Sequence, residues 1–256
     1  MTNPVVGLAQ IAYPTFPTGH GDLLGQIKRI LGEASERGAN IVCFPETFNQ
    51  MHGSTDHIAE QIALICREYG LWVVFGTAMS DNYGLRNSAI IISNKGETAG
   101  IYHKQHLLGG EKDWGIVAGK SPVILETEFG RLGIMICYDI FSSKVVSQYE
   151  DKGVQIILCP SNMVVPIPDF RDRQREIVTS LATAISTQLN CFFGIAMAHG
   201  KGLISESKVV SPRGIIAESD QEGLVFSEVP ADDLAVLPVL DMTQKEQAKF
   251  SAKLQE

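Results

Sequence analysis

Arg131-Leu132-Gly133-Ile134-Met135-Ile136-Cys137-Tyr138-Asp139 is the stretch of the chain that decides the fold. Its apolar run stops at the Cys137 thiol, and polar residues follow. A short apolar run bounded by glycine is typical of a buried strand, and open α/β sheets bind their ligands beyond the ends of such strands. The stretch therefore predicts an α/β fold that holds Cys137 at the mouth of a cleft.

Two further apolar runs end at side chains that can take part in catalysis. Residues 40–45 lead to Glu46, and residues 99–103 lead to Lys104. A thiol attacks poorly until it loses its proton, so a base or a cation has to lie close to it. Glu46 suits a general base, since phenylalanines on both sides dry its surroundings. Lys104 and the backbone N–H of Tyr138 suit the stabilisation of an oxyanion, so the three strand ends predict a hydrolytic site.

The composition is that of a globular protein with a sizeable core. The chain has 256 residues, 45% hydrophobic and 20% charged, and we expect one domain over residues 1–256 with a tail or short helix at about 240–256. The formal charge of -8 disfavours nucleic acid and anionic membranes as partners. We see neither a signal peptide nor an apolar run long enough to span a membrane. Five cysteines, an odd number, then predict reduced thiols and a cytoplasmic location.

The predicted helices and strands alternate twice along the chain. Antiparallel pairs come late in each half, which predicts two similar layers, each a sheet covered by helices, packed sheet to sheet. The expected strands lie at residues 5–11, 41–44, 71–78, 87–93, 98–103, 123–126, 131–136, 154–159, 191–198, 203–210, 214–217 and 223–229. The expected helices lie at residues 21–37, 54–69, 142–151, 169–189 and 243–254, and residues 105–120 are expected to be irregular.

Three motifs resemble those of the nitrilase superfamily of carbon–nitrogen hydrolases. They are Phe44-Pro45-Glu46, residues 102–107 and residues 133–139, and they occur in the family's order and at similar separations. The resemblance covers nearly the whole chain, from residues 6–10 to residues 222–226. One motif alone has little specificity, whereas three in order with matching flanks are specific.

The resemblance implies a four-layer α-β-β-α sandwich with a Glu46–Lys104–Cys137 triad. It implies catalysis through a thioester on Cys137, without a metal or an organic cofactor. A second glutamate is expected on the loop after the lysine, where Glu111 would position Lys104 or hydrogen-bond the substrate nitrogen. Relatives pair through helix-covered faces, which implies a homodimer or larger assembly built on the helix after Cys137 and on residues 169–189.

The chain departs from the family at two places beside the motifs. Relatives commonly carry an arginine two residues after Cys-Tyr-Asp, where this chain has Phe141. Relatives also carry a charged signature in the long helix, where this chain has Thr183-Ala184-Ile185-Ser186-Thr187. Because both sides of a charged pair are missing together, no buried charge is left without a partner. The Cys-Tyr-Asp sequence resembles the amidase-like branch, which implies a small amide or carbamoyl substrate rather than a nitrile.

Other reactions and roles stay open at this point. Nitrile hydrolysis and acyl transfer would use the same triad. A ligand-binding homologue without turnover is a further alternative, supported by the missing arginine alone. A cysteine–histidine hydrolase would need His103, His106 or His199 within reach of the thiol.

For several other polar or aromatic residues, the sequence gives weaker indications of a role in the site. Asn162 follows a predicted strand end and Trp114 lies in the glycine-rich loop, so both are candidates to line the substrate pocket. His103 and His106 are three residues apart, but no third metal ligand is obvious, which favours hydrogen-bonding roles for them. Cys159 also ends a strand and is expected in the core or the pocket wall.

Overall fold

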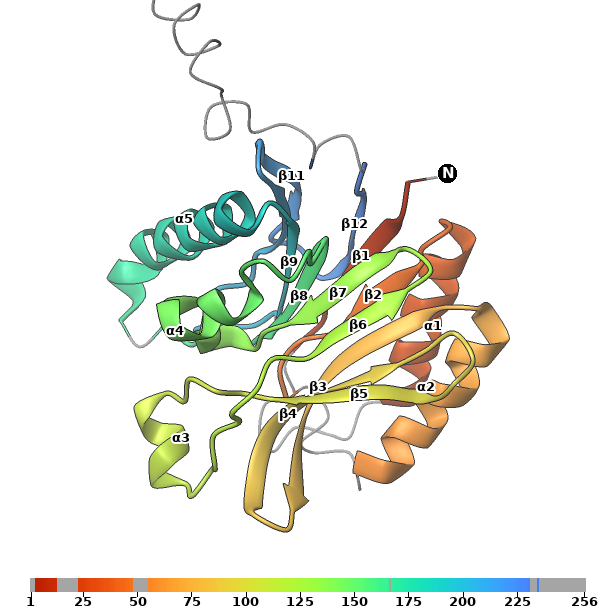
Figure 1. Cartoon of the computed structure of the whole chain (residues 1–256), viewed down its shortest axis with the longest axis horizontal. Helices are drawn as coiled ribbons and strands as arrows, with labels where there is room; N and C mark the ends of the chain where they lie inside the picture. The colour runs from red at the N-terminus through yellow and green to blue at the C-terminus, as the bar shows by residue number, and fades with distance from the viewer. Residues whose placement is uncertain (1–2, 13–22, 48–54, 166, 231–233, 235–256) are drawn as a thin grey trace, which may run out of the picture.

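The computed structural model describes residues 3–12, 23–47, 55–165, 167–230 and 234. Within these residues, twelve strands form two six-stranded sheets that lie face to face, and helices cover both outer faces (Figure 1). The predicted α-β-β-α sandwich is confirmed.

The first sheet combines the N-terminal half of the chain with its last strand. Across the sheet lie β12 (Gly223–Glu228), β1 (Val5–Gln10), β2 (Ile41–Cys43), β3 (Trp72–Asp81), β4 (Gly84–Ile92) and β5 (Thr98–His103). β1, β2 and β3 are parallel, and antiparallel pairs extend the sheet on both sides. Because β5 runs in the same direction as β2, the segments that follow these two strands leave the sheet at the same edge. Glu46 and Lys104 lie in those segments.

The second sheet repeats this arrangement. Across it lie β11 (Gly214–Ser219), β10 (Ser207–Ser211), β9 (Phe192–Met197), β8 (Ile156–Ser161), β7 (Gly130–Ile134) and β6 (Ile124–Thr127). β7, β8 and β9 are parallel, and antiparallel neighbours flank them. The carboxyl end of β7 leads to Cys137, and that of β8 leads to Asn162, so the second sheet also presents its functional candidates at one edge.

Helices form the two outer layers. α1 (Leu23–Glu36) and α2 (Thr55–Tyr69) cover the first sheet, while α4 (Ser143–Val146) and α5 (Arg171–Leu189) cover the second (Figure 1). The short α3 (Gly109–Asp113) lies in the connection between the sheets, and 3-10 turns occur at Cys137–Phe141 (η1), Ser147–Tyr149 (η2) and Pro168–Phe170 (η3). α1 buries its apolar side chains at helical spacing, as its sequence pattern predicts.

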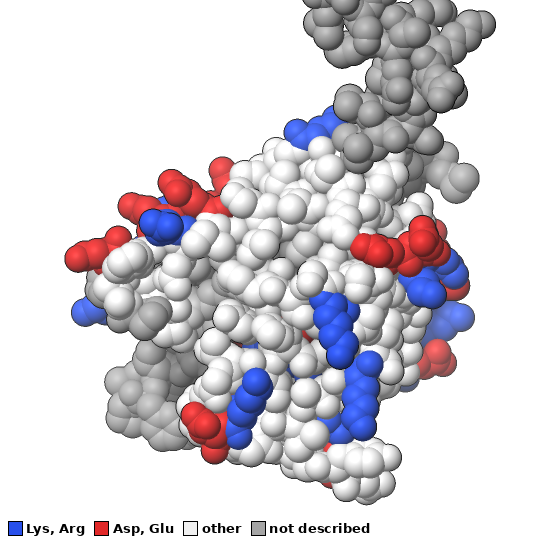
Figure 2. Space-filling view, turned by 60° about the vertical axis from the view of Figure 1, so that its left-hand side comes forward, with Lys and Arg blue, Asp and Glu red and all other residues white. Residues whose placement is uncertain are grey.

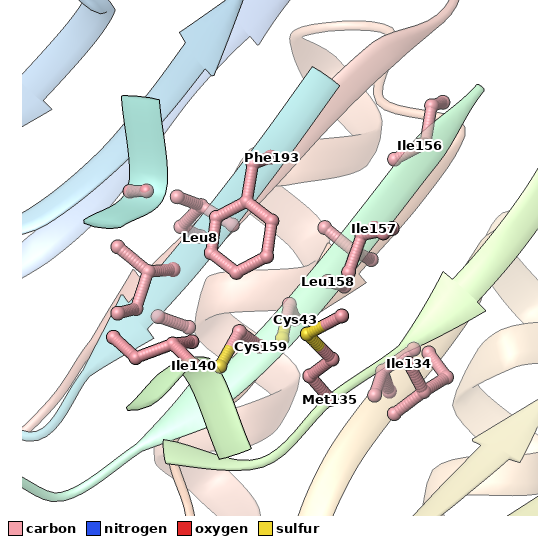
Figure 3. Packing of buried hydrophobic residues seen from close by; sticks show 14 of the residues in the cluster. Leu8, Cys43, Ile134, Met135, Ile140, Ile156, Ile157, Leu158, Cys159 and Phe193 are labelled. Carbon is pink, nitrogen blue, oxygen red and sulfur yellow. The ribbon is translucent and has the colours of Figure 1, made fainter. Parts of the chain in front are cut away.

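Successive side chains of a strand point alternately into the core between the sheets and toward the outer helices. In β1, Leu8 points between the sheets while Ala9 packs toward the outer helices. The same alternation occurs at Cys43 and Val42 in β2, because successive strand residues face opposite sides. Figure 3 shows Leu8 and Cys43 among residues of the second sheet, including Phe193. These contacts hold the two sheets, and with them the two sets of candidate residues, in one rigid frame.

Some predicted elements differ from those observed. The strand expected at residues 131–136 ends at Ile134, so Cys137 lies in the turn η1 and not at the last strand residue. The helix expected at residues 142–151 is shorter, because buried Tyr149 donates its hydroxyl to the Ile134 carbonyl and holds η2 against β7. The irregular segment 105–120 contains α3. The expected helix 243–254 and the tail 240–256 lie outside the described residues.

The surface carries charges of both signs. On the face turned forward in Figure 2, several groups of charged side chains contain both acidic and basic residues, uncharged surface lies between the groups, and no continuous basic surface is visible there. None of the helices in the described part of the chain has the length and apolar character needed to cross a bilayer.

Candidate active site

Glu46 lies where the chain leaves β2, and its carboxylate connects the two sheets. The residue is buried, with 5% of its surface exposed. Its Oε1 accepts hydrogen bonds from Lys104 Nζ and Asn87 Nδ2, each 2.7 Å away. Its Oε2 accepts a hydrogen bond from the backbone N–H of Asn162, 3.0 Å away, at the end of the second sheet. These donors on both sheets fix the orientation of the carboxylate.

Gly76 of β3 lets the backbone of Glu46 approach the sheet closely. A Cβ at position 76 would lie 2.5 Å from Glu46 Cα and 2.6 Å from Thr47 N. The Gly76 N–H donates to the carbonyl of Pro45 at 3.2 Å, and Thr47 has a left-handed φ of 48°. A side chain at position 76 would therefore displace Glu46 from the site.

Lys104 follows β5 directly and is 3% exposed. Its Nζ lies 2.7 Å from Glu46 Oε1 and 2.9 Å from Glu111 Oε2. Burial alone would lower the pKa of Lys104, but the adjacent carboxylates and the Cys137 sulfur outweigh it and raise the pKa well above the usual value. Lys104 is therefore an ammonium ion at neutral pH.

Glu111 and Asn87 complete a closed ring with Glu46 and Lys104, made of three hydrogen bonds and the Lys104–Glu111 ion pair. Glu111 lies on α3 and is buried, and its Oε2 also accepts the backbone N–H of Leu108 at 2.8 Å. The Asn87 Nδ2 lies 2.7 Å from Glu46 Oε1 and 2.7 Å from Glu111 Oε1. In this ring, two carboxylates alternate with two donors, one charged and one neutral.

Cys137 begins the turn η1 with a left-handed φ of 44°, and it is 6% exposed. The turn is held by Asp139, which is fully buried. Its carboxylate accepts hydrogen bonds of 2.7 to 3.1 Å from the backbone N–H groups of Ile136, Gln105 and His106 and from the Tyr102 hydroxyl. Asp139 thereby joins the turn that carries Cys137 to the segment that follows Lys104.

The Cys137 thiol meets Glu46 and Lys104 inside this frame. The sulfur interacts electrostatically with the Glu46 carboxylate and Lys104 and with the backbone N–H of Asn162. Burial and then the charge of Glu46 raise the pKa of the Cys137 thiol well above its usual value, against the opposing effect of Lys104. The thiol thus keeps its proton at neutral pH, and an attack on a carbonyl requires that Glu46 accept this proton as the new bond forms.

The structure brings Glu46, Lys104, Cys137 and Glu111 together, although they come from separate parts of the chain. Asn162 joins them through its backbone N–H rather than its side chain. Asn87 and Asp139 hydrogen-bond within or beside this group, and our sequence reasoning did not identify them. A signal existed for Asn87, because it is a polar residue at the start of the apolar strand run 87–93.

The aromatic and histidine candidates lie around this group. Tyr138 stacks between His106 and Phe141, with ring centroids 5.1 Å and 4.8 Å apart, so aromatic stacking occupies the position where relatives carry the arginine. His103 Nδ1 lies 2.8 Å from Ser88 Oγ, and no group of three or more potential metal-ligating residues occurs in the described ranges. Trp114 is 76% exposed, a surface position that does not by itself support a role as a pocket wall.

The two-sheet sandwich, with a buried carboxylate, ammonium and thiol at one edge, is the arrangement expected of a cysteine-dependent hydrolase of the nitrilase type. The chain belongs to the carbon-nitrogen hydrolase family, whose pattern matches residues 5–238. This confirms, at the level of the family, the resemblance predicted from the three motifs.

Named relatives agree with this assignment. The chain is 27% identical to a nitrilase of Pyrococcus abyssi over 209 residues, covering 76% of this chain and 77% of that protein. It is 25% identical to the omega-amidase NIT2-A of Xenopus laevis over 232 residues, covering 80% and 82%. Among solved structures, an amidase from Nesterenkonia sp. superimposes with a TM-score of 0.76 at 22% identity, covering 97% of this chain and 96% of that one. A cysteine-to-alanine mutant of the Nesterenkonia sp. AN1 amidase in complex with butyramide also has a TM-score of 0.76.

Proposed function

We propose that this carbon–nitrogen hydrolase cleaves the C–N bond of a small amide or carbamoyl compound through a thioester on Cys137. The observation that carries the proposal is that the buried Cys137 thiol interacts electrostatically with the Glu46 carboxylate, whose Oε1 lies 2.7 Å from Lys104 Nζ. This arrangement supplies a nucleophile, a base and a cation within one buried group. Asn162 would contribute its backbone N–H, and its side chain and Trp114 are further candidates to contact the substrate.

The proposed cycle begins when Glu46 removes the thiol proton as the Cys137 sulfur attacks the amide carbon. Lys104 Nζ and the backbone N–H of Tyr138 stabilise the negative oxygen of the tetrahedral intermediate. Glu46 then returns the proton to the departing nitrogen, and ammonia or an amine leaves. A water molecule gives a proton to Glu46 and attacks the thioester, and that proton goes to the Cys137 sulfur when the carboxylic acid is released.

The ring geometry supports separate roles for the two glutamates. Glu46 hydrogen-bonds Lys104 and interacts electrostatically with the Cys137 thiol, which suits a residue that exchanges a proton with the sulfur. Glu111 contacts Lys104 and is anchored by the backbone N–H of Leu108, which suits a residue that holds the ammonium in place. We therefore assign the acid–base role to Glu46 and the positioning role to Glu111.

An amide substrate is preferred because the Cys-Tyr-Asp sequence is of the amidase type and because several relatives are amidases. Omega-amidases of Xenopus and Danio are 24–25% identical to this chain. The nitrilase of Pyrococcus abyssi keeps nitrile hydrolysis as an alternative with the same triad. Acyl transfer remains a second alternative, since it would proceed from the same thioester.

The test is a screen of small aliphatic amides, ω-amides, N-carbamoyl compounds and nitriles for ammonia release. We expect activity on at least one amide or carbamoyl compound and its loss, by at least about 1000-fold, in Cys137→Ala and Cys137→Ser. Cys66→Ala, a buried cysteine of α2, serves as the control and should keep its activity. Activity retained by Cys137→Ala would refute the mechanism, and faster product formation with hydroxylamine than with water would favour the transferase.

We further propose a single domain over residues 1–256 that forms a cytoplasmic homodimer or larger homo-oligomer. The two sheets share one core, and all five cysteines are unpaired and buried, which suits a reducing compartment. The expected interface uses α4 and α5, and α5 exposes Ile177 on its surface. Light scattering that finds a monomer at micromolar concentration would contradict the assembly.

A further inference from the structure

We propose that Asn87 is a positioning residue for the reaction, a neutral donor that allows Glu46 and Glu111 to lie side by side next to a single ammonium group. The inference rests on the proposed function, because it assigns a role within the same site. Asn87 lies in β4, and its backbone carbonyl accepts the N–H of Lys104 at 2.8 Å. The ladder between β4 and β5 therefore sets Asn87 directly opposite Lys104.

The orientation of the Asn87 amide follows from its partners. Both partners are oxygens of ionised carboxylates, which can accept hydrogen bonds but cannot donate them. The Nδ2 group therefore has to face them. Nδ2 has two hydrogens, and the two 2.7 Å contacts to Glu46 Oε1 and Glu111 Oε1 use both. The Oδ1 atom is then left buried without a hydrogen-bond partner among the described residues. A residue that only filled space would be better replaced by an apolar side chain, so the donor group accounts for the asparagine.

The charges around Asn87 explain why a donor is needed. Glu46 and Glu111 share one Lys104, and the site acquires a further negative charge when Cys137 loses its proton. Two carboxylates that close together favour the uptake of a proton by one of them, which would remove the proposed base. A lysine in place of Asn87 would prevent this proton uptake, but its ammonium group would compete with that of Lys104 for the same carboxylates. The Asn87 amide bridges the carboxylates without adding charge.

The ionisable groups that face this bridge come from several elements. Glu46 follows β2, Lys104 follows β5, Glu111 lies on α3 and Cys137 lies in η1. Asp139 in η1 also acts on Lys104 electrostatically. A change at position 87 is thus expected to alter the pH dependence of the whole group and not only the packing of β4.

The experiment compares Asn87→Asp and Asn87→Ser with the wild type in kcat, KM, their pH profiles and the rate of Cys137 alkylation by iodoacetamide. Removal of donors to buried carboxylates should lower kcat by about 10- to 100-fold at neutral pH, with a smaller change in KM. The acid limb of the kcat/KM profile should move up by about one pH unit, and alkylation of Cys137 should slow. Circular dichroism reports whether each variant folds.

Asn94→Asp is the matched control, because Asn94 Nδ2 also donates to a carboxylate, that of Glu128 at 2.7 Å, but at the exposed surface. This variant should keep the wild-type pH profile. If Asn87→Asp does not fold, the same measurements on Asn87→Ser test the inference. An unchanged acid limb in the folded Asn87 variants of an active enzyme overturns the inference alone. A wild type that cleaves no amide and shows no selective alkylation of Cys137 overturns the proposed function, and the inference with it.

Discussion

The close approach of Gly76 to Glu46 makes Gly76→Ala an informative substitution, because it adds one methyl group and touches no proposed catalytic side chain. The new Cβ would lie 2.5 Å from Glu46 Cα, 2.6 Å from Thr47 N and 2.7 Å from Pro45 O, all of which are backbone atoms. Backbone atoms cannot rotate away, so the segment around Glu46 has to move by about 1 Å to restore ordinary contact. A misplacement of that size lowers catalysis by about 100-fold, while overpacking costs about 1–3 kcal/mol of stability.

The assay measures kcat/KM on the best amide of the screen, together with the free energy of unfolding in urea. Gly100→Ala in β5 is the control, because its Cβ would meet only the side chains of Val123 and Leu125, at 3.3 to 3.5 Å. We expect Gly76→Ala to remain folded with activity reduced by about 100-fold and Gly100→Ala to remain near the wild type. Wild-type activity in a folded Gly76→Ala protein would show that the location of Glu46 relative to β3 does not limit the reaction.

Two further predictions concern stability. Burial raises the pKa of the Cys66 and Cys159 thiols from 9.0 to about 12. Between pH 9 and 12 the unfolded chain therefore loses thiol protons that the folded chain keeps. The free energy of unfolding should fall over this range, by up to about 1.4 kcal/mol per pH unit for each thiol. Urea titrations at pH 8, 9 and 10 measure this slope, which should be smaller in Cys66→Ala; an identical slope would contradict the assignment. Lys208 of β10 is buried with its Nζ 2.7 Å from both Glu206 Oε1 and Thr179 Oγ1 of α5, so Lys208→Met should lower the free energy of unfolding by about 3 kcal/mol. Its activity per folded molecule should be unchanged, and a loss of activity without a loss of stability would argue against a purely structural role.

Much of the site was predictable because strand ends are easy to recognise. The runs before Glu46, Lys104 and Cys137 are apolar and short, and parallel strands bring their carboxyl ends to one edge of a sheet. Two such edges meet in a sandwich, so three distant residues converge. The same argument predicts the region of Asn162, although it does not reveal that the backbone N–H makes the contact with Glu46.

The other residues of the site were not predicted, because their contacts are mostly with residues far away in the chain and show little in the local sequence pattern. Asn87 belongs to a run that reads as an ordinary strand, and its role follows only from Glu111 on α3, in a segment that we expected to be irregular. Asp139 comes two residues after Cys137, but three of its four partners, Tyr102, Gln105 and His106, lie more than 30 residues away in the chain. In the sequence, Gly76 is an ordinary glycine within a predicted strand. Only the structure shows that the backbone of Glu46 packs directly against it.

The pairing of β12 with β1 has a consequence for how this chain folds. Residues 5–10 find their antiparallel neighbour only at residues 223–228, about 220 positions later. At the usual speed of translation, roughly 10–45 s pass between the synthesis of these two strands. During that interval β1 presents unpaired N–H and C=O groups along one edge of the nascent sheet, a surface on which other chains can add a strand. We therefore expect truncation before residue 223 to yield aggregation rather than a smaller folded protein, and nascent chains of this length to depend on chaperones.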